Sequence, residues 1–369
     1  MENWKTVRLG DVCILEKGQQ IDTSLLDDSK PYRYINGGIK ESGYFDNFNT
    51  SGESVLISEG GASCGYINYV NENFWCGCHC YRLHDIKVFP KYLFHALKAN
   101  QQRIMALRTG SAMPNIQKST IQKFELKIHD DSTTQKKVST MLDKCNELIE
   151  KHKMTLEKYD TLIKSRFIEM FGDPVTNPNG WEVKRFKDIC DLITDGEHNT
   201  PNRSSKGIYL LSARNIHNHI LKLEDVDYID EEEYARISKR IIPQEGDVLI
   251  SCSGSVGRVC SVPKNFKLQM VRSVALLRLK EIVTPLFMEY LIESDYLQNQ
   301  IDKAKTQSSQ ANLFQGKIAE LKGFVPPLEL QQQFAAFVQH IDKSKFAVQK
   351  SLEKAETLYK SLMQEYFGE

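Results

Sequence analysis

The sequence repeats itself, and this repeat constrains the fold more than any other feature. Residues 158–172 read KYDTLIKSRFIEMFG and residues 354–368 read KAETLYKSLMQEYFG, at an offset of 196 positions (354 minus 158). Earlier in each half, WKTVRLGDVC at 4–13 corresponds to WEVKRFKDIC at 181–190. The repeating unit is much longer than a solenoid repeat. The chain is therefore a tandem duplication, and each half is expected to hold a globular part followed by a helical part.

The helical parts carry a narrow apolar seam. Apolar residues recur at an alternating spacing of four and three over about five heptads, which is typical of a coiled coil. No proline or glycine interrupts residues 135–171, and a helix of about 37 residues would be about 55 Å long. Two such helices are expected to pack antiparallel on each other; the alternative is that each packs on its own globular part. The seam residues are Val138, Leu142, Cys145, Ile149, His152, Leu156, Tyr159, Ile163 and Met170, then Phe334, Val338, Ile341, Val348, Leu352, Ala355, Tyr359, Leu362 and Tyr366.

The globular parts mix short strands with amphipathic helices. Runs such as SVLIS at 54–58 and DVLIS at 247–251 predict strands separated by turns. Helices are expected over 89–107 and 284–302, where a proline suits the start of each. The predicted fold class is α+β, with two globular domains separated by two long antiparallel coiled-coil helices related by a pseudo-twofold axis. The predicted domains are residues 1–132, a first long helix 133–172, residues 173–328, and a second long helix 329–369.

Composition places the chain among ordinary globular proteins. It has 369 residues, 41% of them apolar and 26% charged. Nothing resembles a membrane span or a secretory signal, and nine cysteines suggest reduced thiols, so a cytoplasmic protein is expected. The formal net charge is zero, which argues against a nonspecific polycation but does not exclude nucleic acid, because binding depends on where the charge sits.

Two motifs that resemble catalytic or metal sites are better explained by structure. Gly61-Ala-Ser-Cys-Gly65 matches a nucleophile elbow, but a strand rather than a helix is expected after it, so we predict a glycine turn. Cys76-Gly-Cys-His-Cys80 resembles a metal-binding motif. In a strand the three cysteines would share one face and His79 would point away, and the gaps are short for zinc, so we predict buried thiols. No phosphate-binding loop or zinc-protease motif is present. We therefore predict neither catalytic residues nor a metal in this chain.

Two similar lobes joined by rigid helices suit a bipartite target, and DNA offers this geometry. Each lobe has a polar, partly basic, turn-rich stretch whose side chains suit base edges and phosphates. The two stretches differ more than the helices do, as different half-sites would require. Neutral drift would also produce this difference, and composition alone fits a solvated loop equally well. The candidate DNA-binding residues are Lys17, Gln19, Gln20, Arg33 and Asn36 in the first stretch, and His198, Asn199, Thr200, Arg203, Lys206, Arg214 and Asn215 in the second.

The whole arrangement resembles the specificity subunit of Type I restriction-modification systems. The linker FGDPVTNPNGWEVKRFKDI at 171–189 is similar to the family's junction between the first helix and the second recognition domain. TGSAMPNI at 109–116 and SQANL at 309–313 resemble the loop before the last strand of its recognition domains, which adds Asn115 and Asn312 to the candidates. The first-lobe loop EKGQQI departs from the second in lacking a histidine–proline pattern.

The resemblance implies a non-catalytic subunit whose lobes each read one half of a split, asymmetric site in double-stranded DNA. It implies that the helices set the spacing and dock two methyltransferase (modification) subunits. AdoMet would then belong to those partners, and ATP with Mg to restriction/translocase motor subunits, so this chain would hold no cofactor and contact no membrane. The alternative is a non-catalytic coiled-coil scaffold that presents two lobes to a partner other than DNA.

Overall fold

This computed structural model describes residues 4–110, 112–306 and 311–368. Ser111 in the TGSAMPNI motif, and the first residues of the SQANL motif within 307–310, lie outside the described residues. Helices and strands are mixed along the chain, which confirms the α+β class. No helix in the described part of the chain is long and apolar enough to cross a membrane.

The chain divides into two compact units. Unit 1 comprises Met1–Met154 with Val348–Glu369, and unit 2 comprises Thr155–Ala347. The long helices are α5 (Ser132–Phe171) and α11 (Leu328–Phe367), and each contributes part of its length to each unit. This division differs from the predicted domains, in which each helix stood apart from the globular parts.

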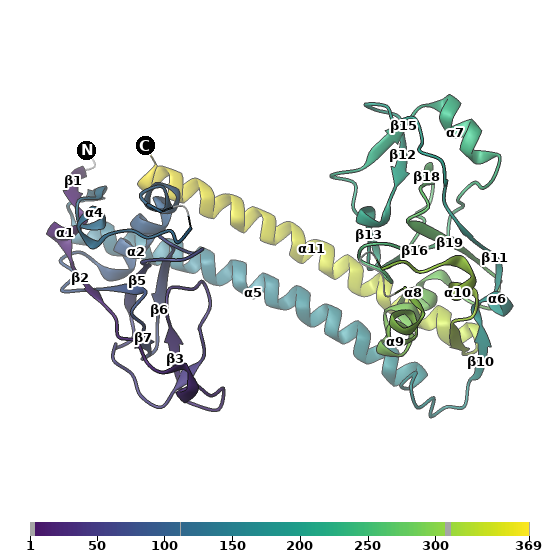
Figure 1. Ribbon diagram of the computed structural model, residues 1–369, viewed down its shortest axis with the longest axis horizontal. Coiled ribbons are helices and arrows are strands. Elements are labelled where there is room, and N and C mark those ends of the chain that lie inside the picture. Colours follow the sequence, from purple (N-terminus) through teal and green to yellow (C-terminus); the bar gives the residue numbers. More distant parts are fainter. Residues whose placement is uncertain (1–3, 111, 307–310, 369) are drawn as a thin grey trace. The chain divides into compact units, whose positions relative to one another are not determined.

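The globular part of unit 1, which we call lobe 1, is built on an antiparallel sheet of order β2-β8-β5-β6 (Figure 1). A second sheet has the order β4-β3-β7, with β3 and β7 parallel, and β1 pairs with β9. The strands are β1 (Trp4–Arg8), β2 (Ile14–Lys17), β3 (Tyr32–Ile35), β4 (Tyr44–Phe45), β5 (Ser54–Ser58), β6 (Ile67–Val70), β7 (Trp75–Cys76), β8 (Cys80–His84) and β9 (Glu125–His129). The helices are α1 (Leu9–Val12), η1 (Thr23–Leu25), α2 (Pro90–Ala99), α3 (Gln101–Met105) and α4 (Lys118–Gln122).

Lobe 2, the globular part of unit 2, repeats this topology. Its sheets have the orders β11-β19-β16-β17 and β15-β12-β18, with β12 and β18 parallel, and β10 pairs with β20. The strands are β10 (Glu182–Arg185), β11 (Cys190–Asp195), β12 (Ile208–Leu211), β13 (Ile216–His217), β14 (Ile220–Leu221), β15 (Asp227–Ile229), β16 (Val248–Ser251), β17 (Val259–Ser261), β18 (Leu268–Met270), β19 (Val274–Leu279) and β20 (Lys322–Val325). The helices are α6 (Phe186–Ile189), η2 (Ala213–Asn215), α7 (Glu231–Ser238), α8 (Pro285–Glu293), α9 (Asp295–Ala304) and α10 (Gln315–Ala319). The matching strand orders confirm the tandem duplication.

The inner strands follow from their apolar runs. Val55, Leu56 and Ile57 in β5 are at most 1% exposed, so both faces of that strand are covered. The matching run at 248–250 in β16 is fully buried. Branched side chains pack well on a pleated surface that is covered on both faces, which explains why these runs form the centres of the two main sheets.

The two predicted amphipathic helices are each split by a break. Asn100 separates α2 from α3, with φ −92° and ψ 15°. Ser294 separates α8 from α9, because its extended backbone ends one helix and its hydroxyl accepts a hydrogen bond from the Leu297 amide to cap the next. The expectation of one continuous helix over 89–107 and over 284–302 was therefore wrong. The breaks were not predicted because asparagine and serine also occur within helices.

The long helices pack against each other within each unit and also on the lobe beside them. In unit 1, Leu142 and Cys145 of α5 share a core cluster with Leu362 and Phe367 of α11 and with residues of lobe 1. In unit 2, a second cluster joins both helices to lobe 2, and Asp160 of α5 pairs with Lys345 of α11. The predicted seam is confirmed, and the alternative of packing on a lobe also holds for part of each helix.

The cysteine motif in lobe 1 does not form one strand. β7 ends at Cys76 and β8 begins at Cys80, with a turn between them. Cys76 and Cys80 are buried, whereas Cys78 is partly exposed. The expectation that the three cysteines share one face of a strand was therefore wrong. The turn after β5 carries the other motif, and Gly61 and Gly65 both have positive φ there, at 77° and 84°.

Phe334 of α11 is expected to be critical for the stability of unit 2. Its side chain is fully buried, and its ring lies 5.5 Å from those of Phe167 and Phe171 and 5.2 Å from Tyr290. We expect Phe334→Ala to lower the free energy of unfolding by about 3–5 kcal/mol, because it leaves a cavity among aromatic rings. Phe346→Ala on the same helix is the control, since Phe346 is 71% exposed. Urea unfolding should show a shift for Phe334→Ala alone.

Candidate nucleic-acid interface

Five segments of lobe 1 meet at one end of its two sheets. They follow β2 (18–20), β3 (36–38) and β5 (59–61), connect β7 to β8 (77–79), and precede α4 (114–116). We call these segments the turn frame of lobe 1. The backbone hydrogen bonds that join them are Gly18 N to Cys80 O (3.1 Å), Gln19 N to Cys76 O (2.8 Å), Gly77 N to Ile35 O (2.8 Å), Glu59 N to His79 O (2.8 Å) and Ile116 N to Glu59 O (2.9 Å).

Lobe 2 builds the same turn frame from segments at 196–199, 212–215, 252–254, 271–273 and 311–313. Each backbone bond of the first frame has a counterpart here. These are Gly196 N to Val274 O (3.0 Å), Glu197 N to Met270 O (2.9 Å), Val271 N to Leu211 O (2.9 Å), Cys252 N to Ser273 O (2.8 Å) and Leu313 N to Cys252 O (2.9 Å). Because the backbone frame is the same, the two lobes differ at this end in the side chains that the frame carries.

A glycine is required where the first segment crosses the turn between the sheets. A Cβ added at Gly18 would lie 2.3 Å from the carbonyl oxygen of Gly77, and one added at Gly196 would lie 2.3 Å from that of Met270. Backbone approaches of this kind exclude any side chain. The glycine that follows β2 or β11 therefore sets the direction in which the polar residues after it leave the sheet.

Most of the candidate residues of lobe 1 lie on its turn frame. The Gln20 side-chain oxygen accepts hydrogen bonds from Asn36 (3.4 Å) and from the thiol of Cys78 (2.9 Å). Gln19 is exposed beside Gln20. Asn115 pairs through its backbone with Gly60 and with Thr109.

The two candidate cations of lobe 1, Lys17 and Arg33, are both held by carboxylates. Lys17 lies 2.7 Å from the buried Glu59, which also accepts a hydrogen bond from Tyr81. Arg33 stands apart from the other candidates, since its ion-pair partner is Glu72 in the loop after β6. The frame of lobe 1 thus presents mainly amide side chains, with one lysine at its edge.

The loop after β11 in lobe 2 is held by acidic residues. Asp195 Oδ2 lies 2.9 Å from His198 Nε2, and Asp195 Oδ1 lies 2.6 Å from Arg240. Burial acts to raise the pKa of Asp195, but the hydrogen bonds from His198 and Arg240 lower it below its usual value. Glu197 accepts from the amide of Asn199 at 3.0 Å. The side chains of His198, Asn199, Thr200 and Lys206 are exposed along this loop.

Two arginines of lobe 2 share one carboxylate. Arg203 Nε lies 3.0 Å from Asp227 Oδ2, and an Arg214 nitrogen lies 3.1 Å from the same oxygen. Arg214 also lies 3.6 Å from Asp225. Both arginine side chains are about half exposed, and exposed pairs of this kind are weak. The structure therefore brings together two candidates that are eleven residues apart in the sequence. A phosphate or a guanine could replace Asp227 as the partner of either arginine.

Asn215 has a structural position that the sequence prediction missed. It is 2% exposed. Its side-chain oxygen accepts from the amide and hydroxyl of Ser212, and its nitrogen donates to the carbonyls of Lys222 and Asp225. The amide group is thus fully used in closing the turn. We correct the prediction of a direct DNA contact: Asn215 shapes the turn that presents Arg214.

Arg272 is a candidate that the sequence analysis did not find. It lies in the turn between β18 and β19, is exposed, and its amide donates to the carbonyl of Glu197 within the frame. Cys78 occupies the matching place in lobe 1. The repeat could have indicated Arg272, because QMVRSVALL aligns with the cysteine motif. That alignment points to an exposed residue only if the motif forms a turn, as it does in the structure. Asn312 lies nearby, pairing through its backbone with Ser253.

Comparison with known proteins agrees with this doubled architecture. The sequence model described as the Type I restriction modification DNA specificity domain matches residues 1–158 and again 178–356. The chain belongs to this family. The match confirms the resemblance of the chain to the Type I specificity subunits.

Individual members of the family show how far the likeness extends. A protein of Mycoplasma genitalium assigned as a type I specificity subunit is 28% identical over 198 residues, which are 53% of this chain and 51% of that protein. One from Mycoplasma pneumoniae is 31% identical over 167 residues, 42% of this chain and 44% of that protein. These matches span about half the length of the relatives. The crystal structure of a Type I S subunit from M. genitalium shares the fold over 100% of this chain and 97% of that one, with a TM-score of 0.72 and 19% identity.

Proposed function

We propose that this chain is the DNA-recognition subunit of a Type I restriction-modification complex, in which each lobe reads one half of a bipartite, asymmetric site. The observation that carries the proposal is the turn frame, which occurs twice with the same backbone hydrogen bonds and different exposed side chains. A repeated frame with different side chains is what a protein needs to read two different short sequences with one architecture. Membership of the specificity family supports the same reading.

The side chains on and beside the two frames suit different bases. Lobe 1 presents the amides of Gln19, Gln20 and Asn36, and amide side chains pair with adenine in the major groove. Lobe 2 presents Arg203 and Arg214, and arginine pairs with guanine or with phosphate. The two half-sites would therefore differ, which makes the whole site asymmetric.

The acidic partners in lobe 2 would limit nonspecific binding. The formal net charge of the chain is zero, so affinity has to come from local cations. In the DNA-free chain, Arg203 and Arg214 are occupied by Asp227. Phosphates have to displace this carboxylate, which lowers the counterion-release contribution that drives binding to any sequence.

The long helices would set the distance between the half-sites and dock two methyltransferase subunits. Large apolar side chains remain exposed along both helices, and such side chains mark interaction surfaces. They are Leu148, Met154, Leu162 and Ile168 of α5, and Phe346 and Leu358 of α11. AdoMet would be bound by those partners, and ATP with Mg by motor subunits, so this chain would contribute recognition and no catalytic group.

Methylation mapping tests the proposal directly. The chain should be expressed with its methyltransferase partner in a host without other adenine methylation, and the modified positions should be read across the genome. The expected result is one split motif with a spacer of constant length. A scaffold for a partner other than DNA would leave the methylation pattern unaffected when this chain is deleted.

Arg203→Ala and Arg214→Ala are expected to weaken binding to the mapped site. If the arginine reads a guanine, its loss should cost about 1–3 kcal/mol and relax the motif at one position. If it meets only phosphate, affinity should fall evenly across sequences and the salt slope should become shallower. Fluorescence anisotropy with the cognate duplex at several salt concentrations separates these results.

Two further variants complete the arginine series, one that frees the arginines and one that serves as a control. Asp227→Asn should raise affinity for unrelated DNA, because it releases both arginines. Lys267→Ala removes an exposed cation that pairs with Glu231 of α7, at the far end of β18 from the frame, and should leave binding unchanged. Equal loss in Lys267→Ala and in the arginine variants would contradict the proposed interface.

A further inference from the structure

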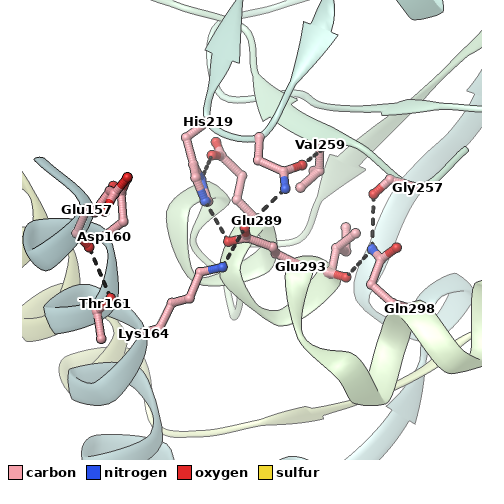
Figure 2. Close-up of polar contacts among 12 residues, drawn as sticks. Glu157, Asp160, Thr161, Lys164, His219, Gly257, Val259, Glu289, Glu293 and Gln298 are labelled. Atoms are coloured by element: carbon pink, nitrogen blue, oxygen red, sulfur yellow. Dashed lines mark hydrogen bonds and ion pairs between the residues drawn. The ribbon is translucent and has the colours of Figure 1, made fainter. Parts of the chain in front are cut away.

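A second group of charged residues surrounds the turn between β13 and β14, which consists of Asn218 and His219 (Figure 2). His219 Nδ1 lies 2.7 Å from Glu289 Oε2, and His219 Nε2 lies 3.0 Å from Glu293 Oε2. Both glutamates belong to α8, and the imidazole ring stacks on Tyr290 between them at 4.1 Å. Because both ring nitrogens face carboxylates, the ring is an imidazolium that donates two hydrogen bonds.

Glu293 connects this turn to helix α5. Its second oxygen, Oε1, accepts hydrogen bonds from Asn218 Nδ2 at 3.1 Å and from Lys164 Nζ at 3.1 Å. Figure 2 shows the Lys164 side chain reaching from α5 to Glu293, with His219 on the other side of the same carboxylate. The contacts from Lys164 to Glu293 and from Glu293 to His219 therefore connect the long helix to the hairpin of lobe 2.

The backbone of His219 is strained. Its φ is +64°, a region that glycine and asparagine enter with less strain than histidine. The amide of His219 donates to the carbonyl of Val259 at 2.9 Å, and the Val259 amide donates to Asn218 Oδ1 at 3.3 Å. Strain of this kind persists where surrounding contacts outweigh it. Here those contacts are the two carboxylates that hold the ring.

Other charges line the cavity of about 540 Å³ beside the ring. Asp160 and Lys164 face it from α5, Asp342 and Lys345 from α11, and Glu289 and Glu293 from α8. Burial acts to lower the pKa of His219, but its hydrogen bonds to Glu289 and Glu293 and the charges of these two residues raise it to about 9. The ring is thus charged throughout the neutral range, and the cluster acts as a fixed brace at physiological pH.

The hairpin that His219 anchors carries the recognition turn at its other end. Asn215 immediately precedes β13, and its carbonyl accepts a hydrogen bond from the amide of Lys222, which follows β14. Arg214 is the residue directly before Asn215. Three residues, 216–218, therefore separate the turn at 213–215, which presents Arg214, from His219 at the tip of the hairpin.

We propose that His219 is a positioning residue for DNA recognition by lobe 2, holding the hairpin and the turn at 213–215 in a defined orientation to helix α5 through Glu293 and Lys164. This proposal rests on the proposed function, since it concerns how the recognition turn is held. Residues without contact to a ligand can change its binding by about 2- to 30-fold through such a coupling.

The test compares variants in the complex with the methyltransferase partner. His219→Asn tolerates the positive φ but removes the cation, and Lys164→Met removes only the link to α5. Each is expected to reduce, by about 2- to 30-fold, the preference for the mapped site over duplexes with one base pair changed in the half read by lobe 2. Preference within the half read by lobe 1 should stay unchanged. The double variant should lose less than the product of the two single losses, because Lys164 and His219 bind the same carboxylate.

Two measurements distinguish positioning from a merely structural role. The wild-type preference for the lobe 2 half should fall as pH rises through about 9, and this step should be absent in His219→Asn. Lys345→Met is the matched control, because Lys345 lines the same cavity but pairs with Asp160, and its preference should match the wild type. Folded His219→Asn and Lys164→Met proteins with wild-type preference in both halves would overturn the positioning role alone. Absence of sequence preference in the wild type would overturn the proposed function instead.

Discussion

Exchange of residues 1–130 for the corresponding lobe of a relative should change one half of the methylated motif and leave the other half as it was. Each lobe has its own sheets, its own core clusters and its own turn frame, so its contacts with bases should travel with it. Residue 130 lies between β9 and α5, where the exchange interrupts no helix or strand. Methylation mapping reports both halves in one experiment.

The donor lobe has to keep the surface that meets α11. Tyr92 packs on Phe367 with ring centroids 5.1 Å apart, and His129 lies 6.0 Å from Tyr366. The donor should therefore have a tyrosine and a histidine at the positions of Tyr92 and His129. Otherwise the hybrid could fail to assemble because lobe 1 no longer packs on α11. The reciprocal control replaces residues 173–326 and should change only the other half. Simultaneous change of both halves in either hybrid would mean that the lobes read DNA jointly.

Insertion of four residues after Leu156 of α5 should lengthen the preferred spacer by about one or two base pairs. Four residues add roughly 6 Å of helix, and DNA rises about 3.4 Å per base pair. They also turn the following residues by about 400°, close to a whole turn, so the apolar seam still faces α11. The complex should therefore assemble and methylate a motif with the same half-sites and a longer gap.

A two-residue insertion at the same place is the matched control. It turns the following part of the seam by about 200°, which exposes Ile163 and Phe167 and removes them from the core that they share with Phe334. This variant should fail to assemble. An active complex with four added residues and an unchanged spacer would show that α5 takes no part in setting the gap.

The parts of the fold that sequence predicted well are those governed by local periodicity. The seam from Val138 to Met170 follows from residue spacing, and the structure buries Leu142 and Ile163 on that seam. The duplication likewise predicted the matched strands β5 and β16. The helix breaks at Asn100 and Ser294 were missed, because both residues also occur inside helices and only the hydrogen bonds in the structure decide between the two uses.

The candidate site was only partly predictable, because its geometry depends on contacts between distant residues. Asn215 looked like a base-reading amide, yet its four hydrogen bonds within the turn are not apparent from composition. Arg203 and Arg214 could be chosen as cations, but their shared partner Asp227 could not. His219 drew no attention in the sequence, since its two carboxylates lie 70 and 74 residues away.

The contribution of α11 to unit 1 has a consequence for synthesis of the chain. Tyr92 is made 275 residues before Phe367 (367 minus 92), and the two rings pack together in the core of the first unit. At about 5–20 residues per second, roughly 14 to 55 s separate their translation. Throughout that interval the apolar surface of lobe 1 and the first half of the α5 seam have no partner helix from the same chain. Lobe 1 is thus made before lobe 2 but completed after it, and its yield in the cell should depend on what covers this surface until α11 has been translated.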